Sequence, residues 1–125
     1  MTAAATAVLP LAEVQAHLQA HLPRWTVSDG AIRRTLRTGG WKGTLMAVNT
    51  IGHLAEAAWH HPELQVSYAT VAIALNTHDA GGITTKDLAL ADKIEQVLFW
   101  QPGAAPGAVL DGTPDTAEHR YIVYD

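Results

Sequence analysis

The chain contains 125 residues, of which 48% are hydrophobic, and it carries a formal net charge of −4 with no cysteine. This length suits one globular domain, and no run of about 18 apolar residues is present that could cross a membrane. The lack of cysteine excludes disulfides, thiolate metal sites and cysteine nucleophiles and fits a reducing, cytoplasmic compartment, while the acidic charge argues against direct binding of nucleic acid.

The first part of the chain predicts a tail followed by a helix. Residues 1–10 are rich in alanine, lack the basic residues of a secretory signal, and are expected to be disordered. Apolar residues at helical spacing predict a helix over Leu11–Leu22, which Pro23 ends. His17 and His21 lie one turn apart on this helix, and we expect both to be exposed without a carboxylate partner.

A hairpin is predicted next. An Asp-Gly pair favours a tight turn between two strands, Trp25–Ser28 and Ile32–Thr38. Arg33, Arg34 and Arg37 fall in the second strand, and we interpret them as a solvated face because they do not belong to a larger basic cluster.

The segment Trp41–Trp59 predicts the most regular helix of the chain. A wide apolar face indicates that this helix packs on a sheet or on another helix. Glu56 and His60 lie one turn apart on its polar side, and Pro62 prevents the helix from continuing.

The remaining elements follow in order. Val66–His78 predicts one long strand or a bent pair of strands, and Thr84 begins a capping-box pattern for a helix that ends at Leu98 or Trp100. The order of elements favours an antiparallel α+β sheet covered on one face.

The composition changes after Trp100. Proline and glycine become frequent, which indicates a linker, and residues 101–125 are expected to form a C-terminal extension to a domain spanning 11–100. Arg120–Tyr124 predicts a short strand within the extension, whose pairing partner the sequence does not identify.

Candidate chemistry gathers where the central helix ends. Glu56, His60 and His61 lie near one another in sequence, and His78 and Asp87 follow a strand and begin a helix. Imidazoles exchange protons near neutral pH, so this set could carry general acid/base catalysis.

Each of these residues also has a structural explanation. Glu56 and His60 could form an ordinary surface pair, Asp87 could cap its helix, and His61 and His78 could be polar residues of a helix end and a loop. A zinc or iron site is a further alternative, but the spacing differs from the H-E-x-x-H pattern and adjacent histidines do not readily share one ion. We therefore predict no metal.

The combined spacing of these residues resembles the pterin-4a-carbinolamine dehydratase family. The resemblance covers about Leu11 to Trp100 and rests on one set of positions: Glu56, His60-His61-Pro62, Tyr68, His78 and Lys86-Asp87. It implies a four-stranded antiparallel sheet with helices packed on one face, in the order α-β-β-α-β-β-α, assembled into homodimers or homotetramers.

The resemblance also implies an activity. Members remove water from 4a-hydroxytetrahydrobiopterin to give the quinonoid dihydropterin during tetrahydrobiopterin recycling, without a metal or organic cofactor. By this resemblance His60, His61 and His78 are the expected catalytic residues, with His60 and His78 flanking the hydroxyl and His61 acting as a base or holding the ring. Glu56 would orient His60 or bind the pterin, and Asp87 would fix a histidine or the entrance.

Two features keep a second function open. Trp59 stands before His60, where the family commonly has a small polar or acidic residue, and the extension is unusual. The alternative is a non-catalytic relative that acts as a transcription cofactor or in Rubisco assembly. A pure scaffold need not keep the histidines, so their retention favours catalysis.

Overall fold

The computed structural model describes residues 6–125 and confirms the predicted α+β order of elements. The predicted disordered tail, residues 1–10, falls partly outside the described residues. Within the described part, the Leu9 amide donates to the Ile83 carbonyl at 2.9 Å. The elements are α1 (Leu11–His21), β1 (Thr26–Ser28), β2 (Ala31–Arg37), α2 (Trp41–Ala58), β3 (Glu63–Val66), β4 (Thr70–Leu75), a 3-10 turn η1 (His78–Ala80) and α3 (Thr85–Leu98).

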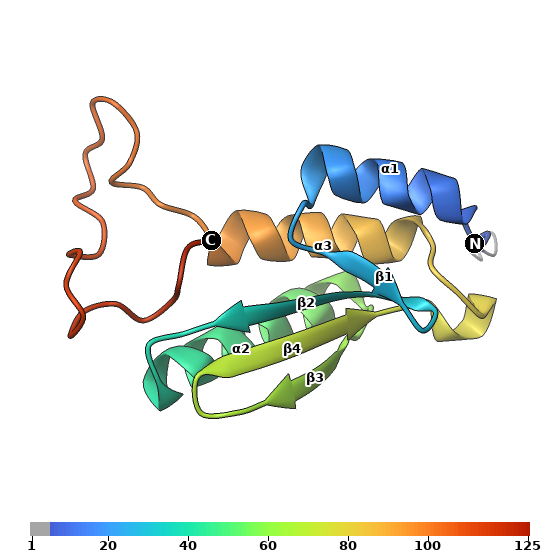
Figure 1. The fold of residues 1–125 in the computed structure, drawn as a ribbon, viewed down its shortest axis with the longest axis horizontal. Coiled ribbons are helices and arrows are strands. Elements are labelled where there is room, and N and C mark those ends of the chain that lie inside the picture. Colours follow the sequence, from blue (N-terminus) through green and yellow to red (C-terminus); the bar gives the residue numbers. More distant parts are fainter. Residues whose placement is uncertain (1–5) are drawn as a thin grey trace.

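The strands form one antiparallel sheet in the order β1-β2-β4-β3 (Figure 1). The turn between β1 and β2 has Asp29 and Gly30 at φ +50° and +74°. Both angles are positive, as a tight hairpin turn of this kind requires, and the predicted hairpin is confirmed. β1 pairs only with Ala31–Arg33, so the second half of β2 extends beyond its neighbour.

The helices cover one face of this sheet and enclose the core. Side chains of β4 alternate, with Val71, Ile73 and Leu75 buried toward the helices and the residues between them half-buried on the other face. Ile51 of α2 and Ile94 of α3 are fully buried against this layer. Within residues 6–125 no helix is both long and apolar enough to span a membrane.

The segment Val66–His78, predicted as one long strand or a bent pair of strands, contains the last residue of β3 and the whole of β4. β3 begins at Glu63, directly after Pro62, and a turn closed by the Ser67 amide and the Thr70 carbonyl at 3.0 Å leads into β4. This turn contains neither glycine nor proline, so the composition that usually marks a hairpin is missing.

Arg34 corrects the prediction of a solvated arginine face. It has the same strand parity as Ile32 and Leu36, points toward the helices, and is 5% exposed. Its guanidinium lies over the ring of Phe99 and pairs with Glu95 at 2.7 Å. The Nε–H is not aimed at the Glu95 oxygen, so this contact is an ion pair without a hydrogen bond.

His17 corrects a second prediction. Its Nε2 lies 3.0 Å from Asp92 Oδ1 on α3, so this histidine has the carboxylate partner that the sequence did not indicate. His21 is exposed as expected. The partner comes from 75 positions away, which no local pattern reveals.

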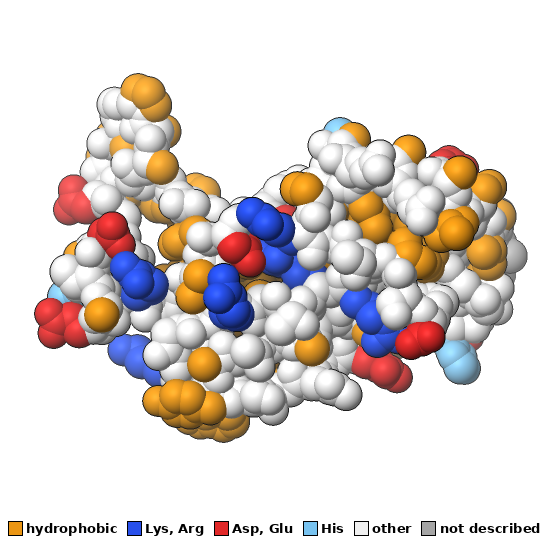
Figure 2. Space-filling view, in the orientation of Figure 1, with side chains coloured by type: hydrophobic (Ala, Val, Ile, Leu, Met, Phe, Trp, Pro, Cys, Tyr) orange, Lys and Arg blue, Asp and Glu red, His pale blue; other side chains and the backbone are white. Residues whose placement is uncertain are grey.

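The extension after α3 forms a projecting loop and then returns to the sheet (Figures 1 and 2). Ile122 pairs with Thr38 in an antiparallel bridge, and the Val123 amide donates to the Arg37 carbonyl at 2.9 Å. The returning segment, residues 121–125, therefore lies along the part of β2 that β1 leaves open. Ile122 is 2% exposed and joins the core. The predicted strand Arg120–Tyr124 is therefore a single bridge at Ile122, and its partner is Thr38.

Candidate active site

The way in which α2 ends determines where His60 and His61 lie. Trp59, which follows the last helical residue, has φ +51° and ψ +48°, and the His60 amide donates back to the Ala55 carbonyl at 3.1 Å. This bond and the left-handed residue form a Schellman-type helix end. Glycine usually occupies such a position, so a tryptophan there carries backbone strain of about 1 kcal/mol. The helix ends abruptly, and the chain turns with His60 and His61 directly after the turn.

His60 contacts a fully buried carboxylate. Its Nε2 lies 2.6 Å from Asp87 Oδ1, and Asp87 is 0% exposed while the His60 side chain is 13% exposed. Asp87 Oδ2 accepts from the Thr77 hydroxyl and from the Thr84 amide, both at 2.9 Å. Asp87 accepts each of these bonds, so His60 donates from Nε2 and its Nδ1 remains for another partner.

Asp87 also has the helix-capping role that the sequence suggested. Thr84 caps α3, its hydroxyl accepts from the Lys86 amide at 3.2 Å, and Asp87 completes the capping box. The Thr84 and Thr77 hydroxyls lie 2.6 Å apart, so the network continues from the helix start to the end of β4. One carboxylate therefore fixes the start of α3 and orients His60, and its complete burial keeps it from direct contact with a ligand.

His61 has a partner of its own. Its Nε2 lies 2.7 Å from Glu56 Oε1, and this pair is open to solvent, with the two side chains 49% and 69% exposed. The predicted interaction of Glu56 with His60 is therefore wrong. The reversal of the chain at Trp59 carries His61 back over the last turn of α2, a geometry that a continuing helix would not produce. The Trp59 ring meets His61 edge-on at 5.0 Å.

His78 lies at the start of η1 and is exposed. In the part of the chain that the structure describes, no hydrogen bond or ring contact joins it to His60 or His61. The neighbouring residue Thr77 does contact Asp87, so the backbone before His78 is fixed to the same carboxylate that orients His60.

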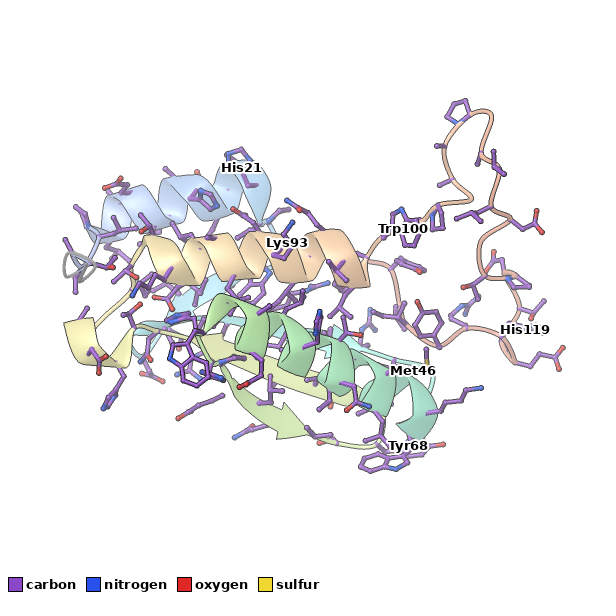
Figure 3. The ribbon with its side chains drawn as sticks, turned by 180° about the vertical axis from the view of Figure 1, so that it is seen from behind. His21, Met46, Tyr68, Lys93, Trp100 and His119 are labelled. Atoms are coloured by element: carbon purple, nitrogen blue, oxygen red, sulfur yellow. The ribbon has the colours of Figure 1, made fainter. Side chains whose placement is uncertain are left out.

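Tyr68 lies away from these residues. Its carbonyl accepts from the Thr44 hydroxyl at 2.9 Å, and Figure 3 shows Tyr68 near the start of α2 rather than at its histidine end. Tyr68 is 70% exposed and is not part of the cluster at the end of α2. Among residues 6–125, no group of three or more metal-binding side chains is close enough to hold an ion.

A groove of about 510 Å³ opens between α2 and α3 next to His60. Its wall and rim include Trp59 and the side chains of Lys86 and Lys93 (Figure 3 labels Lys93). Lys93 is not among the residues that the sequence pattern indicated. The signal that was available is its seven-residue spacing from Lys86, which places both lysines on one face of a helix.

A sequence profile of the family described as pterin 4 alpha carbinolamine dehydratase matches residues 7–97. The chain belongs to this family. A relative from Aquifex aeolicus is 43% identical over 86 residues, which cover 69% of this chain and 86% of that protein. A relative from Chloroflexus aggregans is 44% identical over 88 residues, covering 70% of this chain and 93% of that protein. Both are named only provisionally as pterin-4-alpha-carbinolamine dehydratases.

A solved structure supports the same relationship. The crystal structure of a transcriptional coactivator/pterin dehydratase from Brucella melitensis superposes with a TM-score of 0.68 at 27% identity. The match covers 73% of this chain and 98% of the Brucella chain. The family match ends at residue 97, so the projecting loop and the returning segment lie beyond it.

Proposed function

We propose that this chain dehydrates a pterin 4a-carbinolamine and that His60, His61 and His78 carry the reaction. The observation that carries the proposal is the His60–Asp87 contact of 2.6 Å, in which a fully buried carboxylate orients a partly exposed imidazole. A histidine held in one tautomer by a carboxylate, with its other nitrogen available, is the arrangement that proton transfer requires.

The reaction needs two proton transfers and no change of oxidation state. The C4a–oxygen bond breaks, and the oxygen leaves as water after it receives a proton. The ring nitrogen bonded to C4a loses its proton, and the electron pair forms the new carbon–nitrogen double bond. One group must therefore donate a proton at the hydroxyl while another accepts a proton at the ring nitrogen.

The two histidine–carboxylate pairs suit these two tasks. We assign His60, supported by Asp87, to protonation of the leaving hydroxyl, with His78 at its other side. We assign His61, which contacts Glu56, to removal of the ring-nitrogen proton. In this assignment Asp87 is a positioning residue, Glu56 supports His61, and no metal or organic cofactor takes part.

A second candidate, a protein-binding role without turnover, is favoured by the description of the Brucella relative as a coactivator as well as a dehydratase. Such a role accounts for the Thr77 and Thr84 bonds, which a buried capping carboxylate needs in any folded protein, but it gives no reason to hold a partly exposed histidine, His60, on the same carboxylate. The His60–Asp87 contact therefore favours catalysis. We propose, from the family to which the chain belongs, that the reaction serves the recycling of tetrahydrobiopterin.

The test is the rate at which purified protein dehydrates a freshly generated carbinolamine, followed by the absorbance of the quinonoid product. We expect the unsubstituted chain to exceed the buffer rate by several orders of magnitude, and a His60→Ala, His78→Ala double variant to lose on the order of a thousandfold of that acceleration. His53→Ala is the control, because His53 is an exposed histidine of α2, the helix that precedes His60. A rate for the unsubstituted chain equal to that of buffer would refute the dehydratase proposal.

A further inference from the structure

The groove between α2 and α3 adjoins the candidate active site. His60 lies in its wall, and Trp59 stands between the groove and His61, which it contacts edge-on. A group bound at the histidines could therefore extend a substituent into the groove without leaving the protein surface. The volume of about 510 Å³ falls within the range of about 300–1,000 Å³ that is usual for small-molecule sites.

The groove combines an apolar floor with a cationic rim. Leu54, Ala57, Ala58, Ala89 and Leu90 supply most of the floor. Lys86 and Lys93 stand on the α3 side, and among the described residues 6–125 no acidic side chain lines the groove. Within residues 6–125 neither lysine forms an ion pair, although the chain as a whole carries a net charge of −4. The local charge is thus opposite to that of the molecule.

This chemistry selects one kind of occupant. A neutral substituent gains at most hydrogen bonds from two ammonium groups, whereas a phosphate or carboxylate also gains their charge, and the carboxylate nearest to the wall, Asp87, is buried behind His60 and already paired with it. The apolar floor suits the carbon chain or ring that would link such an anion to the pterin, and the exposed indole of Trp59 offers a flat surface for it to pack against.

We infer that the groove of Trp59, Lys86 and Lys93 binds an anionic substituent of the pterin substrate, carrying either a phosphate or a carboxylate. This inference rests on the proposed dehydratase activity and extends it to the choice of substrate. The pterin ring would lie at His60 and His61, and the substituent would run along α3 from Lys86 toward Lys93.

The test compares carbinolamines that differ only in the ring substituent: a neutral methyl group, a phosphate ester and a chain ending in a carboxylate. We expect kcat/KM to be on the order of tenfold higher for at least one anionic substrate than for the neutral one. This preference should fall on the order of tenfold in a Lys86→Met, Lys93→Met double variant, and it should weaken as salt is added. Lys42→Met, at the opposite end of α2, is the control and should keep the preference.

The outcomes separate this inference from the proposed function. Turnover of the neutral substrate with no preference for either anionic one would overturn the inference and leave the dehydratase activity standing. A preference that survives in the double variant would also overturn it. Absence of turnover with all three substrates would refute the dehydratase activity and the inference with it. A change of oligomeric state in the double variant, with the preference intact, would identify the groove as a surface between copies.

Discussion

A buried network of paired threonine hydroxyls lies at each end of α2, and the two networks lead to different groups. At the histidine end, hydroxyls of Thr77 and Thr84 lie 2.6 Å apart in a buried network. At the opposite end, hydroxyls of Thr38 and Thr44 lie 2.7 Å apart, also buried. Each network connects the start of a helix with the end of a strand. Each of its hydroxyl groups has a hydrogen-bond partner, as buried polar groups require.

The difference lies in where each network ends. The Thr77–Thr84 network leads to a carboxylate and then to an imidazole that reaches the surface. The Thr38–Thr44 network leads to the main-chain carbonyls of Gly40 and Tyr68 and contains no ionisable group. Of these two networks, the one at Thr77 and Thr84 therefore leads to a side chain that can exchange a proton near neutral pH.

The histidine end should respond most strongly to a single change. In Asp87→Asn the amide can donate to His60, which reverses the tautomer of the imidazole and removes the charge that supports its protonated form. We expect turnover to fall on the order of a hundredfold or more, and stability to fall by about 1–3 kcal/mol. Steady-state kinetics and denaturant unfolding of the same variant measure the two effects.

Glu56→Gln is the matched control for Asp87→Asn. The contact distance is nearly the same, 2.7 Å against 2.6 Å, but the Glu56 pair is exposed and screened by solvent. We expect its stability to change by less than about 0.5 kcal/mol and its turnover to fall less than that of Asp87→Asn. Equal losses of stability in the two variants would show that burial does not explain the difference.

The opposite end of α2 should respond structurally. A Cβ at Gly43 would lie 2.1 Å from the Tyr121 carbonyl oxygen, so alanine there must displace the returning segment. We expect Gly43→Ala to lower the free energy of unfolding by about 1–3 kcal/mol and to speed proteolysis within residues 101–120. Urea unfolding and limited proteolysis measure these effects.

Gly52→Ala gives the control on the same helix. In the part of the chain that the structure describes, no atom beyond the helix itself lies within 4 Å of a Cβ at this exposed position, so only helix propensity changes, which favours alanine by about 0.5–1 kcal/mol. Opposite signs for the two substitutions are expected. If Gly43→Ala also stabilised the chain, the returning segment would not be held against α2 as the structure has it.

These contrasts explain what the sequence could reveal. The hairpin, the span of α2 and the Thr84 capping box follow from local rules of turn geometry and periodicity, and the structure confirms them. Periodicity did not identify the buried face of α2 as well, because Trp41 and Trp59 are exposed whereas Ala47 and Ile51 are buried. The partner of Glu56 depends on the reversal of the chain at Trp59, a residue that does not usually adopt a left-handed conformation. Helical spacing therefore pointed to the wrong histidine.

The burial of Arg34 could not be predicted from the sequence, for a different reason. Its ion partners, Glu95 and Asp125, lie on α3 and at the end of the chain, and only the tertiary fold brings them to β2. The pairing of Ile122 with Thr38 likewise needs the open half of β2, which becomes visible only once the length of β1 is known. Family resemblance did not help here, because the match ends before this segment.

The smallest expected effect is a pH dependence at Arg34. The hydrogen bond from its Nη2 to Asp125 Oδ1, at 2.8 Å, holds the pKa of the Asp125 carboxyl below its usual range, although partial burial opposes this. A carboxyl whose pKa is lower in the folded chain stabilises the fold above its unfolded pKa of about 3.9 and loses that contribution as pH falls through the lowered value. We therefore expect Asp125→Asn to reduce stability above pH 5, and we expect this difference to fade below pH 4. The reduction should be less than about 1 kcal/mol, because Glu95 still pairs with Arg34 in the variant.

Asp115→Asn, which removes the exposed partner of Arg120, is the control and should show no such pH dependence. Urea unfolding between pH 3 and 7 compares the two variants. A difference for Asp125→Asn that grew toward acid would mean that the Arg34 contact does not set the stability of the returning segment.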